Sequence, residues 1–356
     1  MKKFLAIAVA LVMIFALAAC AGGGGNDGVR LALITDYGTI DDGSFNQGSW
    51  EGLVAYAEEH NVSHQYIQPP EVSDAAYIDA IELAITGGAE LIVTPGFLFS
   101  AAIYEAQSTF PETKFVLIDS LPDGGSGSHV ADNTVSVLYA EQQSGFLAGY
   151  AAVKDGYRSL GFIGGVAVPP VVLFGTGFVE GAEFAAKELG LSAGDITVNY
   201  HYAGTFGLSP EAQTLAAAWY NDGVEVIFTA AGGVNFSVFA AAESEGGKTI
   251  GVDSDQGHLS PTVITSALKG LQASVYSVIS DFMAGKFPGG QVKVFDASVN
   301  GVGLPMHTSR FNTFSQADYD AIFAKLAANQ IPLSTTIGAD AHEGLNLSLV
   351  QVTSIG

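Results

Sequence analysis

Three aspartates stand directly after short apolar runs, at positions where a carboxylate can meet a bound molecule. Asp36 and Asp119 follow two such runs in the first half of the chain, and Asp253 follows one in the second half. A carboxylate at the carboxyl end of a strand can accept two hydroxyl hydrogen bonds at once, as from a ribose. Phe45 and Phe206 lie in loops of the same kind, and two rings could sandwich a flat ring, with about 1–3 kcal/mol for each stacked face.

Each of these residues also has a purely structural interpretation. Aspartate is a favoured helix N-cap, and phenylalanine is commonly buried in a core. Their recurrence after successive apolar runs in both halves of the chain favours a binding site.

Short β-rich runs alternate with helix-length segments along most of the chain, which predicts parallel sheets built from βαβ units. The predicted strands of the first half are residues 29–35, 62–68, 91–95 and 115–118, with helices over 47–60, 74–86 and 101–108. After an apolar helix over 139–153, the second half has predicted strands at 160–164, 197–202, 224–230 and 249–252, with helices over 178–189, 211–220 and 236–243. We therefore predict an α/β fold of two doubly wound, Rossmann-like lobes with a hinge and a shared cleft.

The last quarter of the chain is too short for a third domain of ordinary size. It contains predicted strands at 263–267 and 292–299 and a loop at 301–305, so the chain is expected to cross back between the lobes. We assign residues 29–138 and 257–290 to lobe 1, and residues 139–256 and 291–356 to lobe 2.

The chain opens with a basic segment followed by an apolar one. Lys2 and Lys3 precede an apolar run over residues 4–19, and Cys20 follows it, which is the pattern of a secretory signal peptide. The run is shorter than the roughly 20 residues that span a bilayer. The segment resembles a bacterial lipobox, so we predict a signal peptide over 1–19, a lipid-modified Cys20 and a flexible glycine-rich tether up to residue 28. The alternative is an ordinary cleaved signal with an unrelated cysteine near its end.

The composition excludes several classes of partner. The formal net charge is −23 over 356 residues, and two of the 13 basic residues, Lys2 and Lys3, belong to the predicted signal peptide. Such a surface repels nucleic-acid phosphates and anionic lipid headgroups. We therefore expect no nucleic-acid partner, and attachment to the extracytoplasmic face of the cell membrane through acyl chains such as palmitate on Cys20.

Five segments together resemble the basic membrane lipoprotein family. They are Asp41-Asp42-Gly43-Ser44-Phe45-Asn46, Gly145-Phe146-Leu147-Ala148-Gly149-Tyr150, Gly161-Phe162-Ile163-Gly164-Gly165, Ile250-Gly251-Val252-Asp253-Ser254-Asp255-Gln256 and Thr265-Ser266-Ala267-Leu268-Lys269. They occur in the family's order within about residues 29–305. The resemblance implies a type I periplasmic binding protein fold and a monomeric purine-nucleoside receptor that serves the permease of an ABC importer.

The resemblance also implies roles for eight residues. Phe45 and Phe206 would stack on the two faces of the purine, and Asn46 would hydrogen-bond to its edge. The other contacts would come from Asp36 to the base, from the backbone at Gly232 to the base pocket, and from Asp119, Asp253 and Lys269 to the ribose hydroxyls.

The chain departs from the family pattern at two places, which bear on the choice among nucleosides. Gly207-Leu208-Ser209 follows Phe206 where the family has an acidic residue, and Val234-Asn235-Phe236 stands where the family repeats glycine. Asp255 is an alternative ribose ligand, but Asp253 stands nearer the strand end. Lys269 could instead be a surface lysine, the commoner position for this residue type.

Enzymatic motifs are not found in the sequence. Residues 175–181 approximate a dinucleotide-binding fingerprint with the wrong spacing, and there is no phosphate-binding loop, zinc-protease helix or nucleophile elbow. We predict no catalytic residue, no metal site and no cofactor. A sugar or signal-molecule receptor of the same fold is the main alternative. A nucleoside hydrolase with Asp36 and Asp119 as a carboxylate pair is a weaker one, since Asp36, Asp41 and Asp42 only faintly imitate the metal-binding loop that such an enzyme needs.

Overall fold

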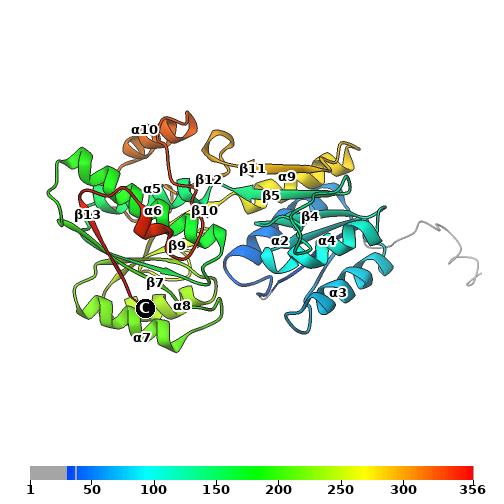
Figure 1. Cartoon of the computed structure of the whole chain (residues 1–356), viewed down its shortest axis with the longest axis horizontal. Helices are drawn as coiled ribbons and strands as arrows, with labels where there is room; N and C mark the ends of the chain where they lie inside the picture. The colour runs from blue at the N-terminus through cyan, green and yellow to red at the C-terminus, as the bar shows by residue number, and fades with distance from the viewer. Residues whose placement is uncertain (1–29, 37, 356) are drawn as a thin grey trace, which may run out of the picture.

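A computed structural model describes residues 30–36 and 38–355. These residues form two lobes side by side, each with one sheet covered by helices (Figure 1). The predicted signal peptide, Cys20 and the tether lie outside the described residues. The predicted α/β fold of two doubly wound lobes is confirmed.

The first lobe contains a six-stranded sheet in which every strand pair is parallel. Across the sheet the strands are β11 (Gln291–Phe295), β5 (Thr134–Tyr139), β4 (Lys114–Ile118), β3 (Leu91–Pro95), β1 (Leu31–Ile34) and β2 (His64–Ile67). Successive side chains of β1 point to opposite faces, because the side-chain period of a strand is two. Leu31 and Leu33 pack with α2 (Phe45–His60) and α9 (Leu271–Met283). Ala32 and Ile34 pack with the helices of the other face, which are α3 (Asp74–Thr86) and α4 (Ser100–Thr109).

The second lobe contains a seven-stranded sheet. Its order is β12 (Val302–Gly303), β10 (Val263–Lys269), β9 (Lys248–Asp253), β8 (Val226–Ala230), β6 (Ser159–Gly164), β7 (Ile196–Tyr202) and β13 (Val350–Ser354). All pairs are parallel except that of β10 with β12. One face is covered by α5 (Glu141–Lys154) and α6 (Pro169–Leu189), and the other by α7 (Pro210–Asn221) and α8 (Val234–Glu245). Helix α10 (Gln316–Ala327) packs beside α5.

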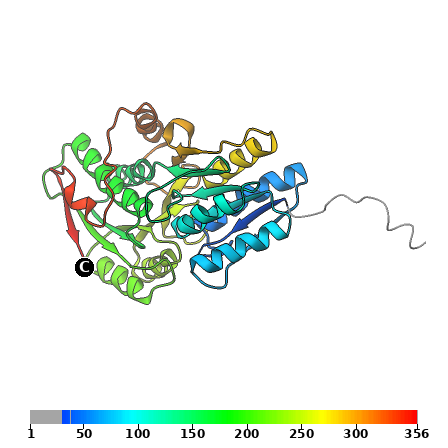
Figure 2. The same cartoon turned by 45° about the vertical axis from the view of Figure 1, so that its right-hand side comes forward.

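The chain passes between the lobes three times. It crosses from β5 to α5, from β10 to α9, and from β11 to β12, with the last connection containing η2 (Ala297–Val299). The turned view in Figure 2 shows how the two lobes lie against each other. The first connection follows directly after Tyr139, the last residue of β5.

The two later boundaries predicted from the sequence are wrong. Residues 257–290 were assigned to lobe 1, but β10 pairs in parallel with β9 in the second sheet. Residues 291–356 were assigned to lobe 2, but β11 pairs with β5 at the edge of the first sheet. An apolar run identifies a strand but carries no signal for which of two similar sheets it joins: β10 pairs with β9 only 14 to 15 positions away, whereas β11 pairs with β5 156 positions away.

Helices α5 and α6 lie unusually close together beside the first connection. A Cβ atom at Gly145 would collide with the carbonyl oxygen of Phe174, and one at Gly149 with that of Phe178. Only glycine permits this approach of two helix backbones. The glycine pair in the family segment 145–150 therefore fixes α5, and with it the start of the second lobe, against α6.

No helix within the described residues is long and apolar enough to cross a membrane.

Candidate functional site

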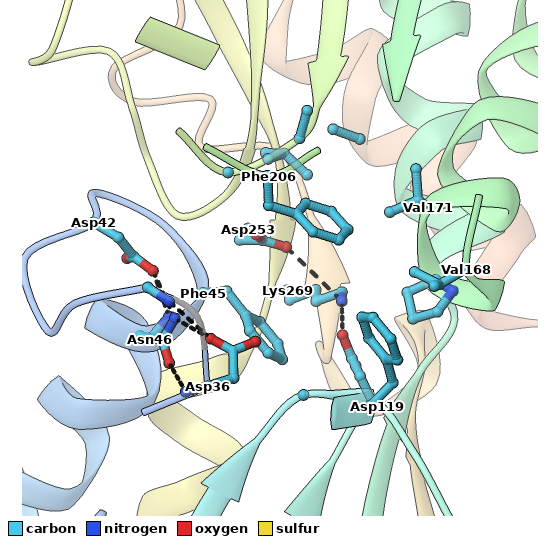
Figure 3. A pocket seen from close by; sticks show the side chains of 18 of the residues that line it. Asp36, Asp42, Phe45, Asn46, Asp119, Val168, Val171, Phe206, Asp253 and Lys269 are labelled. Atoms are coloured by element: carbon cyan, nitrogen blue, oxygen red, sulfur yellow. Dashed lines mark hydrogen bonds and ion pairs between the residues drawn. The ribbon is translucent and has the colours of Figure 1, made fainter. Parts of the chain in front are cut away.

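A cavity of about 830 Å³, counting the space at its mouth, lies between the two lobes. It is lined by loops that follow the carboxyl ends of strands in both sheets, the position expected for open α/β sheets. All eight predicted ligand-binding residues line it: Asp36, Phe45, Asn46, Asp119, Phe206, Gly232, Asp253 and Lys269. Figure 3 shows most of these side chains converging on the same space.

Lobe 1 contributes a group of polar side chains, joined by hydrogen bonds, at the start of α2. The Nδ2 atom of Asn46 donates to Asp36 Oδ1 at 2.9 Å and to Asp42 Oδ2 at 3.0 Å, as the dashed lines in Figure 3 mark. Asp42 also accepts backbone N–H groups at the helix start, from Asn46 at 3.0 Å and from Gln47 at 3.1 Å. The Oδ1 atom of Asn46 accepts the backbone N–H of Asp36 at 3.4 Å, and a carbonyl oxygen with two lone pairs can accept one further donor from a ligand.

Phenylalanines enter the cavity from both lobes. Phe45 is the first residue of α2 in lobe 1, and Phe206 lies in the loop after β7 in lobe 2. The backbone carbonyl of Phe206 accepts the N–H of Gly233 at 2.8 Å, and its ring lies so close to Gly165 that a side chain there would collide with it. Two rings from different lobes are positioned to contact a flat ligand from different sides.

Asp119 and Asp253 occupy corresponding places in the two lobes. Asp119 directly follows β4, Asp253 is the last residue of β9, and their φ angles are 60° and 64°. Such left-handed backbone costs a non-glycine residue on the order of 1–3 kcal/mol and is concentrated at functional sites. With every carboxylate ionised, Asp119 Oδ1 is buried without a hydrogen-bond donor in the described part of the chain. A ligand hydroxyl can supply that donor.

Lys269 lies at the centre of a buried charged cluster. Its Nζ atom pairs with Asp119 Oδ2, with Glu141 Oε1 at 3.3 Å and with Asp253 Oδ1 at 3.8 Å. The same atom is 5.0 Å from the ring centroid of Phe45. The side chain of Lys269 is only 3% exposed, so the interpretation of this lysine as a surface residue does not agree with the structure.

The protonation of the cluster follows from its burial. Burial raises the pKa of Asp253 to about 6, although Lys269 opposes the shift. Burial also raises the pKa of Glu141, to about 8, again against the attraction of Lys269. Burial alone would lower the pKa of Lys269, but Asp119, Glu141 and Asp253 together raise it above its ordinary value. The lysine is therefore charged at every physiological pH. Any change in the protonation of the cluster takes place on its carboxyl groups.

Hydrogen bonds across the cleft hold the lobes together. Ser44 Oγ of lobe 1 donates to Asp253 Oδ2 at 2.6 Å, and Gln256 Nε2 of lobe 2 donates to the carbonyl of Gly43 at 3.0 Å. Ser254 Oγ donates to the carbonyl of Ser44 at 3.2 Å. The described conformation is therefore a closed one.

Some contributors were not predicted from the sequence. Asp42 and Phe174 line the cavity, and Glu141 stands behind Lys269. Asp42 was assigned to the motif around Phe45 and was considered only for the hydrolase alternative, and Glu141 begins a helix whose other buried residues are mostly apolar. The alternative ribose ligand, Asp255, is not among the lining residues and instead accepts hydrogen bonds from Thr308 at 2.6 Å and Gly257 at 3.0 Å.

Two lobes that close on a lined cavity define a solute-binding protein. A sequence profile described as "ABC transporter substrate-binding protein PnrA-like" matches residues 29–334. The chain belongs to this family, which includes the basic membrane proteins, and it is a substrate-binding protein of an ABC transporter with an extracytoplasmic place of action.

Three relatives illustrate the similarity. The chain is 31% identical over 359 residues to the ABC transporter nucleoside-binding protein BmpA of Lactococcus lactis, covering 91% of this chain and 98% of that one. It is 28% identical to basic membrane protein A2 of Borrelia garinii, covering 93% and 96%. A solute-binding protein of an ABC transporter system from Aeropyrum pernix has a TM-score of 0.76 at 23% identity, covering 89% and 96%, and this likeness concerns the fold alone.

Proposed function

We propose that the cavity captures a purine nucleoside and that the closed protein delivers it to an ABC permease. The observation that carries this proposal is the combination, in one cavity, of a phenylalanine from each lobe with a buried lysine flanked by Asp119 and Asp253. The rings suit the two faces of a base, and the charged cluster suits the vicinal hydroxyls of a ribose. The name of the Lactococcus relative supports the same ligand class.

The charges that line the cavity favour an uncharged ligand. Asp36, Asp42, Asp119 and Asp253 contribute four carboxylates against the single lysine. A phosphate would be repelled at this site, so nucleotides should be rejected although they contain the same base and ribose.

The test is a calorimetric and thermal-shift panel on the chain from residue 20 onward with Cys20→Ser, using adenosine, guanosine, inosine, cytidine, AMP, ribose, glucose and galactose. A ligand at a hundred times its dissociation constant should stabilise the fold by about 2.7 kcal/mol. Purine nucleosides should raise the melting temperature, and AMP should not. A response to hexoses alone would replace this proposal with the sugar-receptor alternative.

We also propose that Cys20 carries acyl chains that hold the protein on the outer face of the cell membrane. Support comes from the lipobox-like segment and the glycine-rich tether over residues 21–28. Cys20→Ser in the full chain should abolish incorporation of labelled palmitate. Incorporation that survives the substitution would contradict acylation at Cys20.

A further inference from the structure

Glu141 is a buried carboxyl group at the hinge. It is the first residue of α5, just after β5, and so stands at the first connection between the lobes. Lys269 is the last residue of β10 and stands just before the second connection, to α9. The ion pair of 3.3 Å between them therefore joins two of the three connections. Because Glu141 is not among the residues that line the cavity, it can act on a ligand only through Lys269.

The cluster around Lys269 has more acidic groups than it can neutralise. Three carboxyl groups surround one ammonium group, and the four side chains are 3% to 10% exposed. Full ionisation would leave two excess negative charges in a buried site, which is costly enough that such groups take up protons instead. Asp119 and Glu141 pair with the same ammonium group, so the two carboxylates lie close enough to repel each other, and a proton on one of them relieves that repulsion.

The crowding depends on closure of the lobes. Asp119 belongs to lobe 1, whereas Lys269 and Asp253 lie on strands of lobe 2 and Glu141 starts the first helix of that lobe. Opening the cleft would move Asp119 away and admit water, and both changes relieve the excess of negative charge.

We propose that Glu141 is a positioning residue that holds Lys269 at the hinge and takes up one proton from solvent when the lobes close, so that ligand capture is linked to protonation. The titratable groups that act on Glu141 are Lys269 from β10, Asp119 from the end of β4 and Tyr139 from the end of β5. Asp253 of β9 contacts the same ammonium group from the second lobe. The inference rests on the proposed function only for the identity of the ligand.

The direction of the pH dependence follows from the pKa of Glu141. Burial raises this pKa from 4.5 to about 8 in the closed form, with Lys269 opposing the shift and Asp119 adding to it. In a hydrated open form the pKa lies nearer its ordinary value, so closing binds a proton between the two values. Closure and affinity then weaken as pH rises toward 8, by at most about tenfold per pH unit, and level off above it.

A distance measurement tests this without any ligand. Cys20 is the only cysteine, so Glu82→Cys on α3 and Gln213→Cys on α7 can be spin-labelled specifically in the chain from residue 20 onward with Cys20→Ser. The closed fraction should fall between pH 6.5 and pH 9 in the parent protein and stay constant in Glu141→Gln. Glu180→Gln serves as a matched control, because Glu180 is another partly buried carboxyl group with a raised pKa but lies outside the cluster. It should keep the parent profile.

Nucleoside affinity provides the second readout. The dissociation constant of the parent protein should rise between about fivefold and thirtyfold from pH 6.5 to pH 9, and that of Glu141→Gln by less than about twofold. Glu141→Gln should bind more tightly than the parent at both pH values, and by the larger factor at pH 9, because the open-form glutamate is already ionised at pH 6.5 and must take up a proton to close. Glu141→Ala, which offers Lys269 no acceptor, should bind more weakly than Glu141→Gln at both pH values.

The outcomes separate the two proposals. If no nucleoside binds but the interlobe distances respond as described, the ligand assignment fails and the role of Glu141 stands. If nucleosides bind and Glu141→Gln retains the parent pH profile, or is weaker than the parent at both pH values, the role of Glu141 is overturned. This decision holds even if Glu141→Ala does not fold.

Discussion

Two buried glutamates on neighbouring helices of lobe 2 have opposite electrostatic behaviour. Burial raises the pKa of Glu141 on α5 to about 8. Burial also acts to raise the pKa of Glu183 on α6, but hydrogen bonds and Lys187 lower it to about 2. Ser348, Leu349 and Val350 together donate to Glu183, with distances of 2.7 to 3.0 Å. The number of donors, and not burial, decides which glutamate is ionised.

The comparison separates a region built for binding from one built for stability. The carboxylate of Glu183 receives its hydrogen bonds and its ion pair from groups of the chain itself. These contacts fix the C-terminal segment before β13 onto α6. The cluster around Lys269 has acceptors in excess, including a buried oxygen of Asp119. These unsatisfied acceptors lower the stability of the ligand-free protein. When a ligand donates hydrogen bonds to them, the gain in free energy contributes to ligand binding.

Removing the only cation of the cluster should have the largest effect. Lys269→Met preserves the length of the side chain but leaves three buried carboxyl groups unpaired, which should cost about 3–5 kcal/mol of folding free energy at pH 8. The loss should be smaller at pH 5.5, because the unpaired carboxyl groups take up protons. Urea unfolding at both pH values measures this, and Lys248→Met is the control on an exposed lysine at the start of β9. An equal loss at both pH values would contradict the account.

Replacing Glu183 by glutamine should lower the free energy of unfolding with a pH dependence that differs from that of the Lys269 variant in cause and range. A lowered pKa contributes stability above the unfolded value of about 4.5, and this contribution disappears as pH falls toward 2. Glu183→Gln should therefore lose about 2–3 kcal/mol at pH 7 and progressively less below pH 4.5. Ligand affinity should be unchanged, since Glu183 does not line the cavity. Chemical unfolding at pH 7 and pH 3, with calorimetric titration, tests both statements.

Phe206 should affect affinity with little effect on stability. Its ring is partly exposed in the cavity, and loss of one stacked base face should weaken nucleoside binding about 5- to 150-fold, or 1–3 kcal/mol. The matched control is Phe236→Ala, because Phe236 is exposed and does not line the cavity. Isothermal titration of both variants, with their melting temperatures, would show whether the ring serves binding. Equal affinities for Phe206→Ala and the parent would remove stacking from the proposal.

Four of the five charged residues that line the cavity were predicted from the sequence, three of them because parallel strands end at a common edge. Asp36, Asp119 and Asp253 follow strand ends, and that pattern is local. Glu141 was missed because its importance comes from Lys269, which is 128 positions away in the chain and meets it only where two interlobe connections lie side by side. An acidic residue that opens an otherwise apolar, buried helix was the available signal.

The prediction of lobe membership failed for a related reason. The runs that form β10 and β11 were both recognised as strands, but their assignments to sheets were exchanged. β11 adds to the first sheet beside β5, a strand that was itself not predicted from the sequence. Pairing between segments more than 150 positions apart is set by tertiary packing, to which local pattern is blind.

The smallest predicted effect concerns a contact between the lobes outside the charged cluster. Ser254 Oγ donates to the carbonyl of Ser44 across the cleft, and one such hydrogen bond contributes about 0.5–1.5 kcal/mol. Because the bond exists only in the closed form, Ser254→Ala should weaken ligand binding about two- to tenfold without changing its pH dependence. Titration at pH 6.5 and pH 9 checks this, with Ser244→Ala as a control on an exposed serine. A changed pH profile would mean that the interlobe contact of Ser254 is energetically coupled to the cluster around Lys269. The division into a binding region and a stabilising region would then have to include this contact as a third region.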